Sequence, residues 1–130
     1  MANNRTVLGK AGASTVNIYR FVKRNALVID QASAVNDAVL GVAGETAAAG
    51  KQLSIIVSGL CEVDFAAAVA PGTTLTTDAE GKAVAAAAAI PTEHILGEYC
   101  PEPVNGVVAN STSGARGRIL LYDNKLQIKI

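Results

Sequence analysis

Large hydrophobic side chains are scarce in this chain of 130 residues, which contains no tryptophan, 2 phenylalanines, 3 tyrosines and 1 methionine. The apolar half of the sequence is dominated by alanine and valine instead. A core of small side chains buries less area per residue. At ~25 cal/mol per Å² it leaves a thin margin over the conformational entropy lost on folding. We therefore expect association with a partner to add stability.

An excess of charge of either sign is also missing, because 11 lysines and arginines balance 11 aspartates and glutamates. Nucleic-acid binders usually carry a clear basic excess, since neutralising phosphates supplies much of their affinity. We therefore expect no nucleic-acid partner. Near-zero net charge removes one barrier to self-association.

Long apolar runs are absent, since no stretch approaches the ~20 residues that span a bilayer and the N-terminal MANNRTVLGKAGAS lacks the apolar run of a signal peptide. We expect neither membrane insertion nor export. The 2 cysteines, Cys61 and Cys100, are expected to remain free thiols in a reducing cytoplasm, with a disulfide between them as the alternative.

Residues that carry out catalysis are equally sparse. The single histidine, His94, precedes Cys100 by six residues, which on a strand places them ~20 Å apart, too far for direct proton transfer. Without CxxC or HxxxH spacing, these residues also make a poor zinc site. The segment GETAAAGKQ at 44–52 resembles a phosphate-binding loop, but five residues separate its glycines and glutamine follows the lysine. We predict no enzyme, no catalytic residues, no metal and no cofactor, and a surface loop at 44–52.

Strand patterns are plentiful. Short segments rich in β-branched residues and bounded by Gly, Asn, Asp or Pro occur at 16–22, 26–30, 38–43, 52–65, 94–100 and 118–130. They predict an all-β fold, a single small β-barrel or tulip-like sandwich. Ser58-Gly59 interrupts the longest segment and predicts a turn or a bulge. Tight turns are expected at Asp78–Gly81 and at Asp123-Asn124.

Two alanine runs, at 66–72 and 83–91, complicate this pattern because alanine has the highest helix propensity. Both runs contain proline near their ends, which stops a helix. We therefore expect one or two short helical turns, one of them at Ala85–Ala89, with a loop over one end of the barrel as the alternative.

A weak internal repeat joins VLGVAGETAAAG at 39–50 to ILGEYCPEPVNG at 95–106. Both segments begin with an aliphatic residue before Leu-Gly, and both end in glycine nine positions after that Leu-Gly. An apolar strand pattern follows each one. The repeat predicts two similar strand-loop-strand units in one domain.

The chain is expected to divide into a flexible N-terminal arm at 1–15 and a β-rich domain at 16–130. The arm contains few apolar residues and buries little surface within one subunit. It is expected to lie across a neighbouring subunit, where backbone groups extend a sheet edge, with a disposable tail as the alternative. Basic residues at 116 and 118, where the last predicted strand begins, offer a second contact with an acidic partner, with an ordinary solvated face as the equal alternative. The candidate interface residues are Arg5, Val7, Leu8, Lys10, Arg116 and Arg118.

The order VNIYRFVKRNALVID, DAVLGVAGETAAAGKQLSIIVSGLCEV, AAAVAPGTTLTTDAEGKAVAAA, HILGEYCPEP and GRILLY resembles the small capsid decoration or cement proteins of tailed bacteriophages, which are sometimes mislabelled as recombinase-like. The resemblance covers residues 16–122 and leaves out the last strand pattern, KLQIKI. It implies a non-enzymatic structural virion protein, made in the bacterial host cytoplasm and located on the outer capsid surface. There it would bind the major capsid protein and stabilise contacts between capsid subunits.

The resemblance also implies a homo-oligomer, commonly a trimer, with a dimer as the alternative. Two other functions remain open from the residues alone. One is a small ligand-binding or enzymatic β-barrel whose pocket the sequence does not reveal, and the other is a phage tail or fibre component.

Overall fold

The computed structural model describes residues 5–33, 39–86, 95–103, 106–107 and 110–122. These residues form an antiparallel sheet that curls into a half-barrel, which confirms the predicted all-β class. They contain no helix that is long and apolar enough to cross a membrane. The strands are β1 (Arg5–Lys10), β2 (Phe21–Asn25), β3 (Val28–Gln31), β4 (Gly41–Ala43), β5 (Gln52–Asp64), β6 (Thr74–Thr77), β7 (Ala83–Ala85), β8 (Gly97–Tyr99) and β9 (Arg116–Leu121).

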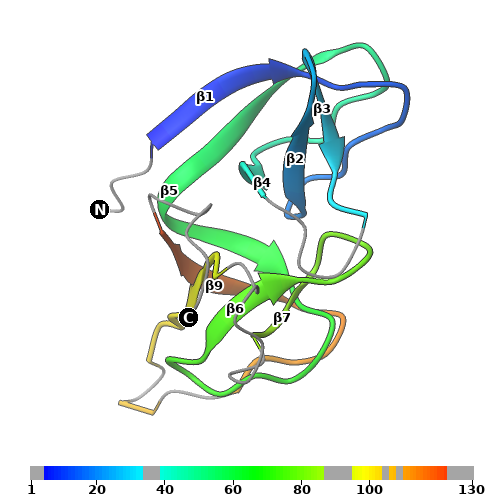
Figure 1. The fold of residues 1–130 in the computed structure, drawn as a ribbon. Coiled ribbons are helices and arrows are strands. Elements are labelled where there is room, and N and C mark those ends of the chain that lie inside the picture. Colours follow the sequence, from blue (N-terminus) through cyan, green and yellow to red (C-terminus); the bar gives the residue numbers. More distant parts are fainter. Residues whose placement is uncertain (1–4, 34–38, 87–94, 104–105, 108–109, 123–130) are drawn as a thin grey trace.

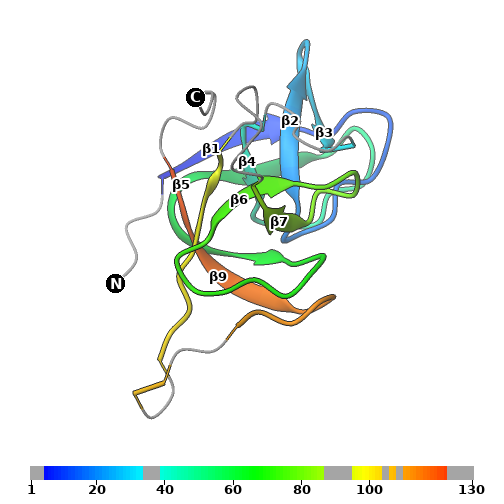
Figure 2. The same cartoon turned by 60° about the horizontal axis from the view of Figure 1, so that its bottom comes forward.

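Strand β5 runs through both halves of the curled sheet (Figures 1 and 2). Its first part pairs with β1 and β4, and its last part, Gly59–Asp64, pairs with β9. Between these parts the register against β1 skips Val57, and Gly59 adopts a φ of 101°. The predicted interruption at Ser58-Gly59 is therefore a bulge within one strand, and glycine permits the positive φ there.

The internal repeat corresponds to two similar units. The strand order β3-β2-β4-β5-β9-β8-β6-β7 reads the same from either end: a hairpin, a three-residue strand, then a longer strand. The repeated glycines match as well. A Cβ at Gly41 would collide with the main-chain oxygen of Ile56, and one at Gly97 with that of Leu120, while Gly50 and Gly106 both adopt a φ of 78°. The predicted pair of strand-loop-strand units is confirmed in this strand order.

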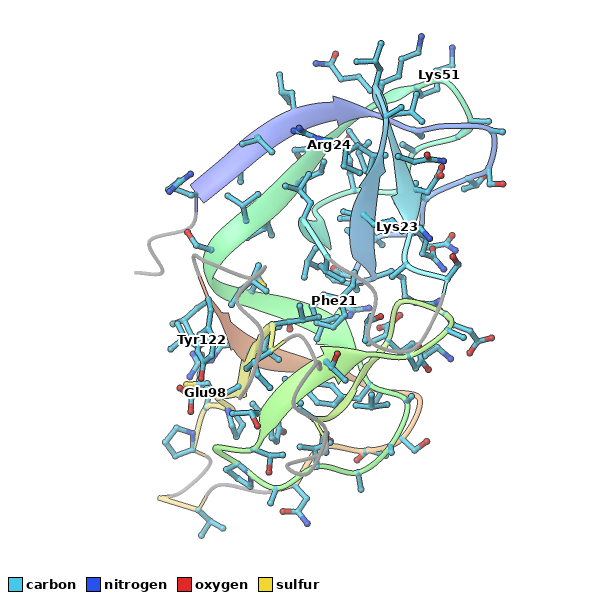
Figure 3. All side chains as sticks on the ribbon, in the orientation of Figure 1. Phe21, Lys23, Arg24, Lys51, Glu98 and Tyr122 are labelled. Atoms are coloured by element: carbon cyan, nitrogen blue, oxygen red, sulfur yellow. The ribbon has the colours of Figure 1, made fainter. Side chains whose placement is uncertain are left out.

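Two clusters of buried side chains fill the fold. The smaller cluster lies in the β1–β5 half and contains Ala11, Val16, Val22, Ile29, Ala43, Ala47, Leu53, Ile55 and Val57. The larger contains Phe21, Ala32, Val39, Val42, Cys61, Val63, Phe65, Val69, Leu75, Ala83, Leu96, Tyr99, Ile119 and Leu121. Phe21 and Val22 belong to different clusters because successive strand residues face opposite sides. The labelled Phe21 accordingly lies between the two halves in Figure 3.

The β2–β3 hairpin begins and turns later than the sequence predicts. Tyr19, with a φ of 68°, is in the left-handed region, so the strand expected at 16–22 starts only at Phe21. Ala26 and Leu27 form the two-residue turn between the paired Asn25 and Val28, so the strand expected at 26–30 starts at Val28. The φ of 56° at Ala26 suits such a turn, although a residue with a Cβ is strained there.

The expected helical turns are not found among the described residues. Ala85 ends strand β7, and the stretch at 66–72 is irregular and closes in a turn in which the Thr73 N–H donates to the Ala70 carbonyl. Pro71 and Gly72 occupy the centre of that turn, and a short alanine run does not repay the cost of helix nucleation. Residues 87–89 lie outside the described residues, as does the turn expected at Asp123-Asn124. The hairpin expected around Asp78–Gly81 is present as β6–β7.

Part of the segment assigned to an N-terminal arm pairs with the sheet as β1. The residues after β1 then enter the fold: Ala11 and Val16 are buried, and the Gly12 N–H donates to the Ile29 carbonyl. The flexibility of residues 1–15 stays a prediction.

Candidate protein interface

Strand β1 is held to the sheet by its backbone rather than by buried side chains. Its ladder with β5 runs from Arg5 opposite Ser58 to Lys10 opposite Gln52. None of its side chains is buried, and Leu8 remains 70% exposed. In the part of the chain that the structure describes, its second edge pairs with no strand. Exposed apolar side chains on an unpaired edge are features of a contact surface.

The candidate residues on β9 lie at the other end of β5. Arg116 is paired with Asp64, the last residue of β5, whereas Lys10 is paired with Gln52, the first. The structure therefore does not bring the two groups of candidates together.

Both β9 arginines have contacts within the chain. The guanidinium carbon of Arg116 lies 3.8 Å from the centroid of the Tyr19 ring. Arg118 donates from Nε to the Cys100 carbonyl at 2.8 Å and from Nη1 to Glu102 at 3.2 Å. These contacts give the arginines a role in holding β9, so they fit a partner less well than unpaired cations do.

A shallow depression joins β1 to the tip of the β2–β3 hairpin. Leu8, Gly9, Lys10, Leu27, Gly50 and Gln52 line it, and no carboxylate is among them. Leu27, at the hairpin turn, is 96% exposed, so it and Leu8 are the two most exposed large hydrophobic residues that the structure describes. The sequence analysis missed Leu27, because neither it nor Ala26 is a typical turn residue.

Three cations lie near this depression: Lys10 lines it, Lys51 stands between its lining residues Gly50 and Gln52, and Arg24 lies on β2 close to the hairpin turn, where it also lines a second depression. Figure 3 labels Arg24 and Lys51 near the end where β1 approaches the hairpin. Their side chains make no hydrogen bond or ion pair with any described residue, whereas Arg20, Lys82 and Arg118 each pair with a carboxylate. We call Leu8, Lys10, Arg24, Leu27 and Lys51 together the Leu8–Leu27 face.

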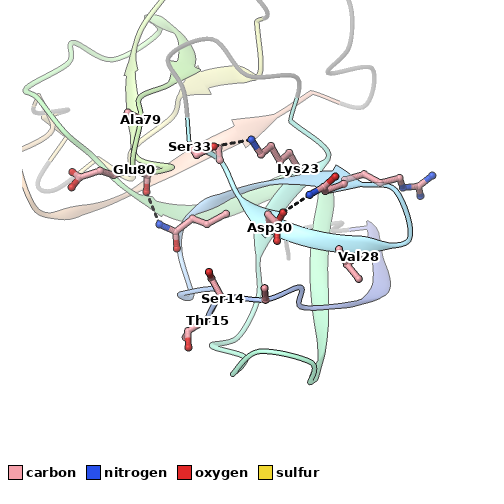
Figure 4. A pocket seen from close by; sticks show the side chains of 13 residues that line it. Ser14, Thr15, Lys23, Val28, Asp30, Ser33, Ala79 and Glu80 are labelled. Atoms are coloured by element: carbon pink, nitrogen blue, oxygen red, sulfur yellow. Dashed lines mark hydrogen bonds between the residues drawn. The ribbon is translucent and has the colours of Figure 1, made fainter.

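A second, polar depression of about 780 Å³ lies along the β2–β3 hairpin, and Arg24 is among the residues that line it (Figure 4). Its side chains bond mainly to one another and to nearby backbone. Lys23 Nζ donates to Ser33 Oγ at 2.7 Å, Asn25 Nδ2 donates to Asp30 Oδ2 at 2.9 Å, and Gln31 Nε2 donates to the Glu80 carbonyl at 2.9 Å. The first two bonds hold the hairpin and the segment after it together, and the third joins the hairpin to the loop between β6 and β7.

Of the residues weighed for catalysis, the structure describes the two cysteines. Cys61 is buried in the larger core cluster, Cys100 is partly buried, and no disulfide joins them. His94 lies outside the described residues. Among the residues that the structure describes, no three His, Cys, Asp or Glu side chains group as metal ligands. The loop at 44–51 leads into strand β5, as expected, and not into the helix that a phosphate-binding loop requires.

The phenol of Tyr122, just after β9, has a shifted pKa. Its burial, the negative charge of Glu98 and a hydrogen bond to that carboxylate all raise the pKa of Tyr122 above its usual value of 10.0. The phenol therefore stays neutral at physiological pH and serves as a donor to Glu98 (both labelled in Figure 3). This pair joins the end of β9 to β8.

Comparisons with known proteins place the chain in a virion context. The sequence matches the profile of a family described as phage cement protein over residues 13–120. No protein with a curated functional description matches it. Among solved structures, the head fiber gp8.5 N base in bacteriophage phi29 has a similar fold, with a TM-score of 0.63 and 19% sequence identity over 98% of this chain and 99% of that chain.

Proposed function

Because this chain belongs to the phage cement protein family, we propose that it binds the outer surface of a phage capsid and stabilises the contacts between major capsid subunits. The family match over residues 13–120 carries this proposal. The fold supports it in two ways. The unpaired edge of β1 and the exposed leucines offer contact surface, and the alanine-rich core benefits from burial against a partner.

Capsids that lack this protein test the proposal. Purified protein added to them is expected to bind saturably at hundreds of copies per particle and to raise the temperature at which the particles release DNA, because a cement bridges neighbouring subunits. Quantitative gel densitometry and a DNA-dye melting assay measure both effects. Saturation without any gain in particle stability contradicts the cement role.

Substitutions of the residues weighed for catalysis serve as controls in the same assay. His94→Ala and Cys100→Ser are expected to bind and stabilise capsids like the wild type, since neither residue has a role in the proposed contact. Loss of function in a folded variant would favour the enzymatic or ligand-binding alternative.

A second candidate is the base of a fibre attached to the capsid. The similarity to the phi29 head fiber base, which extends over nearly the whole of both chains, favours it. Particle stability distinguishes the two functions, because a cement bridges neighbouring capsid subunits and is expected to raise the temperature of DNA release, whereas a fibre base only has to attach. The same melting assay therefore decides between them.

We further propose that the protein is a homo-oligomer, a trimer in the first instance with a dimer as the alternative. A net charge of zero and a core of small side chains both favour association. Sedimentation equilibrium at micromolar concentration is expected to yield a multiple of 13.2 kDa, three times that mass for a trimer. A mass of 13.2 kDa across that concentration range would contradict the oligomer.

A further inference from the structure

The Leu8–Leu27 face has the composition of a docking surface. Leu27 is 96% exposed and Leu8 is 70% exposed, and both line one depression. Water-exposed leucines are unfavourable on a free surface and gain from burial in a partner. Ala26 has a positive φ of 56° in the turn that presents Leu27, a backbone strain of the kind that gathers at binding sites.

The charges on this face indicate which kind of partner it binds. Lys10, Arg24 and Lys51 make no ion pair with the residues that the structure describes. No carboxylate lines the depression that Leu8, Lys10 and Leu27 share, whereas Asp30 and Glu80 line the second depression, which Arg24 borders. Lys10 and Lys51 are also close to each other, because Lys10 pairs with Gln52 and the Ala11 N–H donates to the Lys51 carbonyl. Cations grouped in this way favour a partner that supplies carboxylates.

The same charges disfavour a second copy of this chain as the occupant. A symmetric dimer formed through this face would bring the three cations of one subunit against those of the other. Such a contact places like charges together in a partly desolvated interface, which is unfavourable. A different protein with acidic residues fits the face better.

From these observations we propose that the Leu8–Leu27 face is the capsid-binding surface, and that it docks on an acidic rim around an apolar pocket of the major capsid protein. Leu27 enters the pocket, Leu8 covers its margin, and Lys10, Arg24 and Lys51 pair with the rim. This assignment rests on the proposed function and adds to it which surface makes the contact. It also moves the contact away from Arg116 and Arg118, which are engaged within the chain.

Two variants of the full chain test the face by cosedimentation with capsids that lack this protein. Leu27→Ser removes the apolar anchor, and Arg24→Glu with Lys51→Glu reverses two charges. Each is expected to weaken binding at least about tenfold, as loss of a central contact does. Binding of the wild type is expected to fall as salt rises, and binding of the charge-reversed variant to depend less on salt. Because all three side chains are exposed, thermal unfolding should stay within a few degrees of the wild type.

Matched controls lie away from the face. Val107→Ser removes an apolar side chain that is 66% exposed in the loop between β8 and β9. Arg116→Glu with Arg118→Glu makes the same change of charge on β9. Both are expected to bind within about twofold of the wild type, because substitutions outside the centre of an interface cost little.

Four results would overturn the assignment. If the wild type binds and both face variants bind equally well, the contact lies elsewhere while the proposed function stands. If the β9 variant keeps the melting temperature of the wild type and alone loses binding, β9 is the contact. If duplex DNA of random sequence competes for the face with the affinity of the capsid, the cations bind phosphates and not an acidic protein. If the wild type does not bind capsids, the proposed function fails together with the face.

Discussion

Replacing Phe65 with alanine is expected to lower the free energy of unfolding by about 3–5 kcal/mol, the range for buried phenylalanines. The Phe65 ring is fully buried and meets Tyr99 edge to face, with 5.0 Å between the ring centroids. Gly117 makes room for this ring, since a Cβ there would lie 2.8 Å from Phe65 Cε1. With only 2 phenylalanines and no tryptophan in the chain, small side chains nearby have little capacity to fill the cavity.

Urea unfolding of the variant, followed by circular dichroism, measures this loss. Leu27→Ala is the matched control, because it removes a large hydrophobic side chain that is 96% exposed and is expected to change stability by less than about 0.5 kcal/mol. Domains of this size are stable by about 5–15 kcal/mol, so the Phe65 variant is also expected to lose capsid binding near its lowered melting temperature. If the free energy of unfolding falls by less than about 1 kcal/mol, the larger core cluster closes around the cavity left by the Phe65 ring.

Replacing Gly97 with alanine is expected to cost about 3 kcal/mol, a large effect for one methyl group. The new Cβ would collide with the main-chain oxygen of Leu120, and a strand backbone has less freedom to move away than a side chain has. Strand β8 has three residues and bonds to β6 and β9, so a shift there disturbs both neighbours. Gly41→Ala is expected to behave alike, since Gly41 approaches Ile56 in the same way in the other unit.

Gly106→Ala provides the comparison for the Gly97 variant. Gly106 has a φ of 78°, and a Cβ there meets nothing within 4 Å, so its substitution costs only the left-handed backbone penalty of about 1 kcal/mol. Melting temperatures and soluble yields of the variants measure the difference. Equal losses of melting temperature in the Gly97 and Gly106 variants would mean that β8 and β9 separate readily. Such a result would refute the close approach of Gly97 to the Leu120 backbone.

Several elements could be predicted from the sequence because local pattern and tertiary environment agree. In β5, buried side chains alternate with outward-facing ones, and the apolar residues Leu53, Ile55 and Val57 occupy the buried positions. The β6–β7 turn was predictable from Asp78 and Gly81, because the Asp78 carboxylate accepts from the backbone of Glu80 and Lys82. The repeated Leu-Gly pairs pointed to two similar units.

Other elements could not be predicted, because their cause is not local. Strand β1 buries no side chain, so it carries no pattern of a half-buried strand and was assigned to an arm. Its pairing depends on backbone groups of β5, more than forty residues away in the sequence. The late starts of β2 and β3 follow from positive φ at Tyr19 and Ala26, residues that rarely adopt it.

For the candidate interface, the sequence by itself determined the kinds of contact that are available: neutral overall charge, few large apolar residues, and candidate contact residues such as Leu8 and Lys10 near the N-terminus. These follow from composition and short-range pattern. Only the tertiary structure decided which residues act together. It brings Leu27 beside Leu8 and Lys10, and it engages Arg116 and Arg118 within the chain. The physical reason is that a surface is assembled by strand pairing between distant segments, and side-chain burial and ion pairing are properties of that assembly.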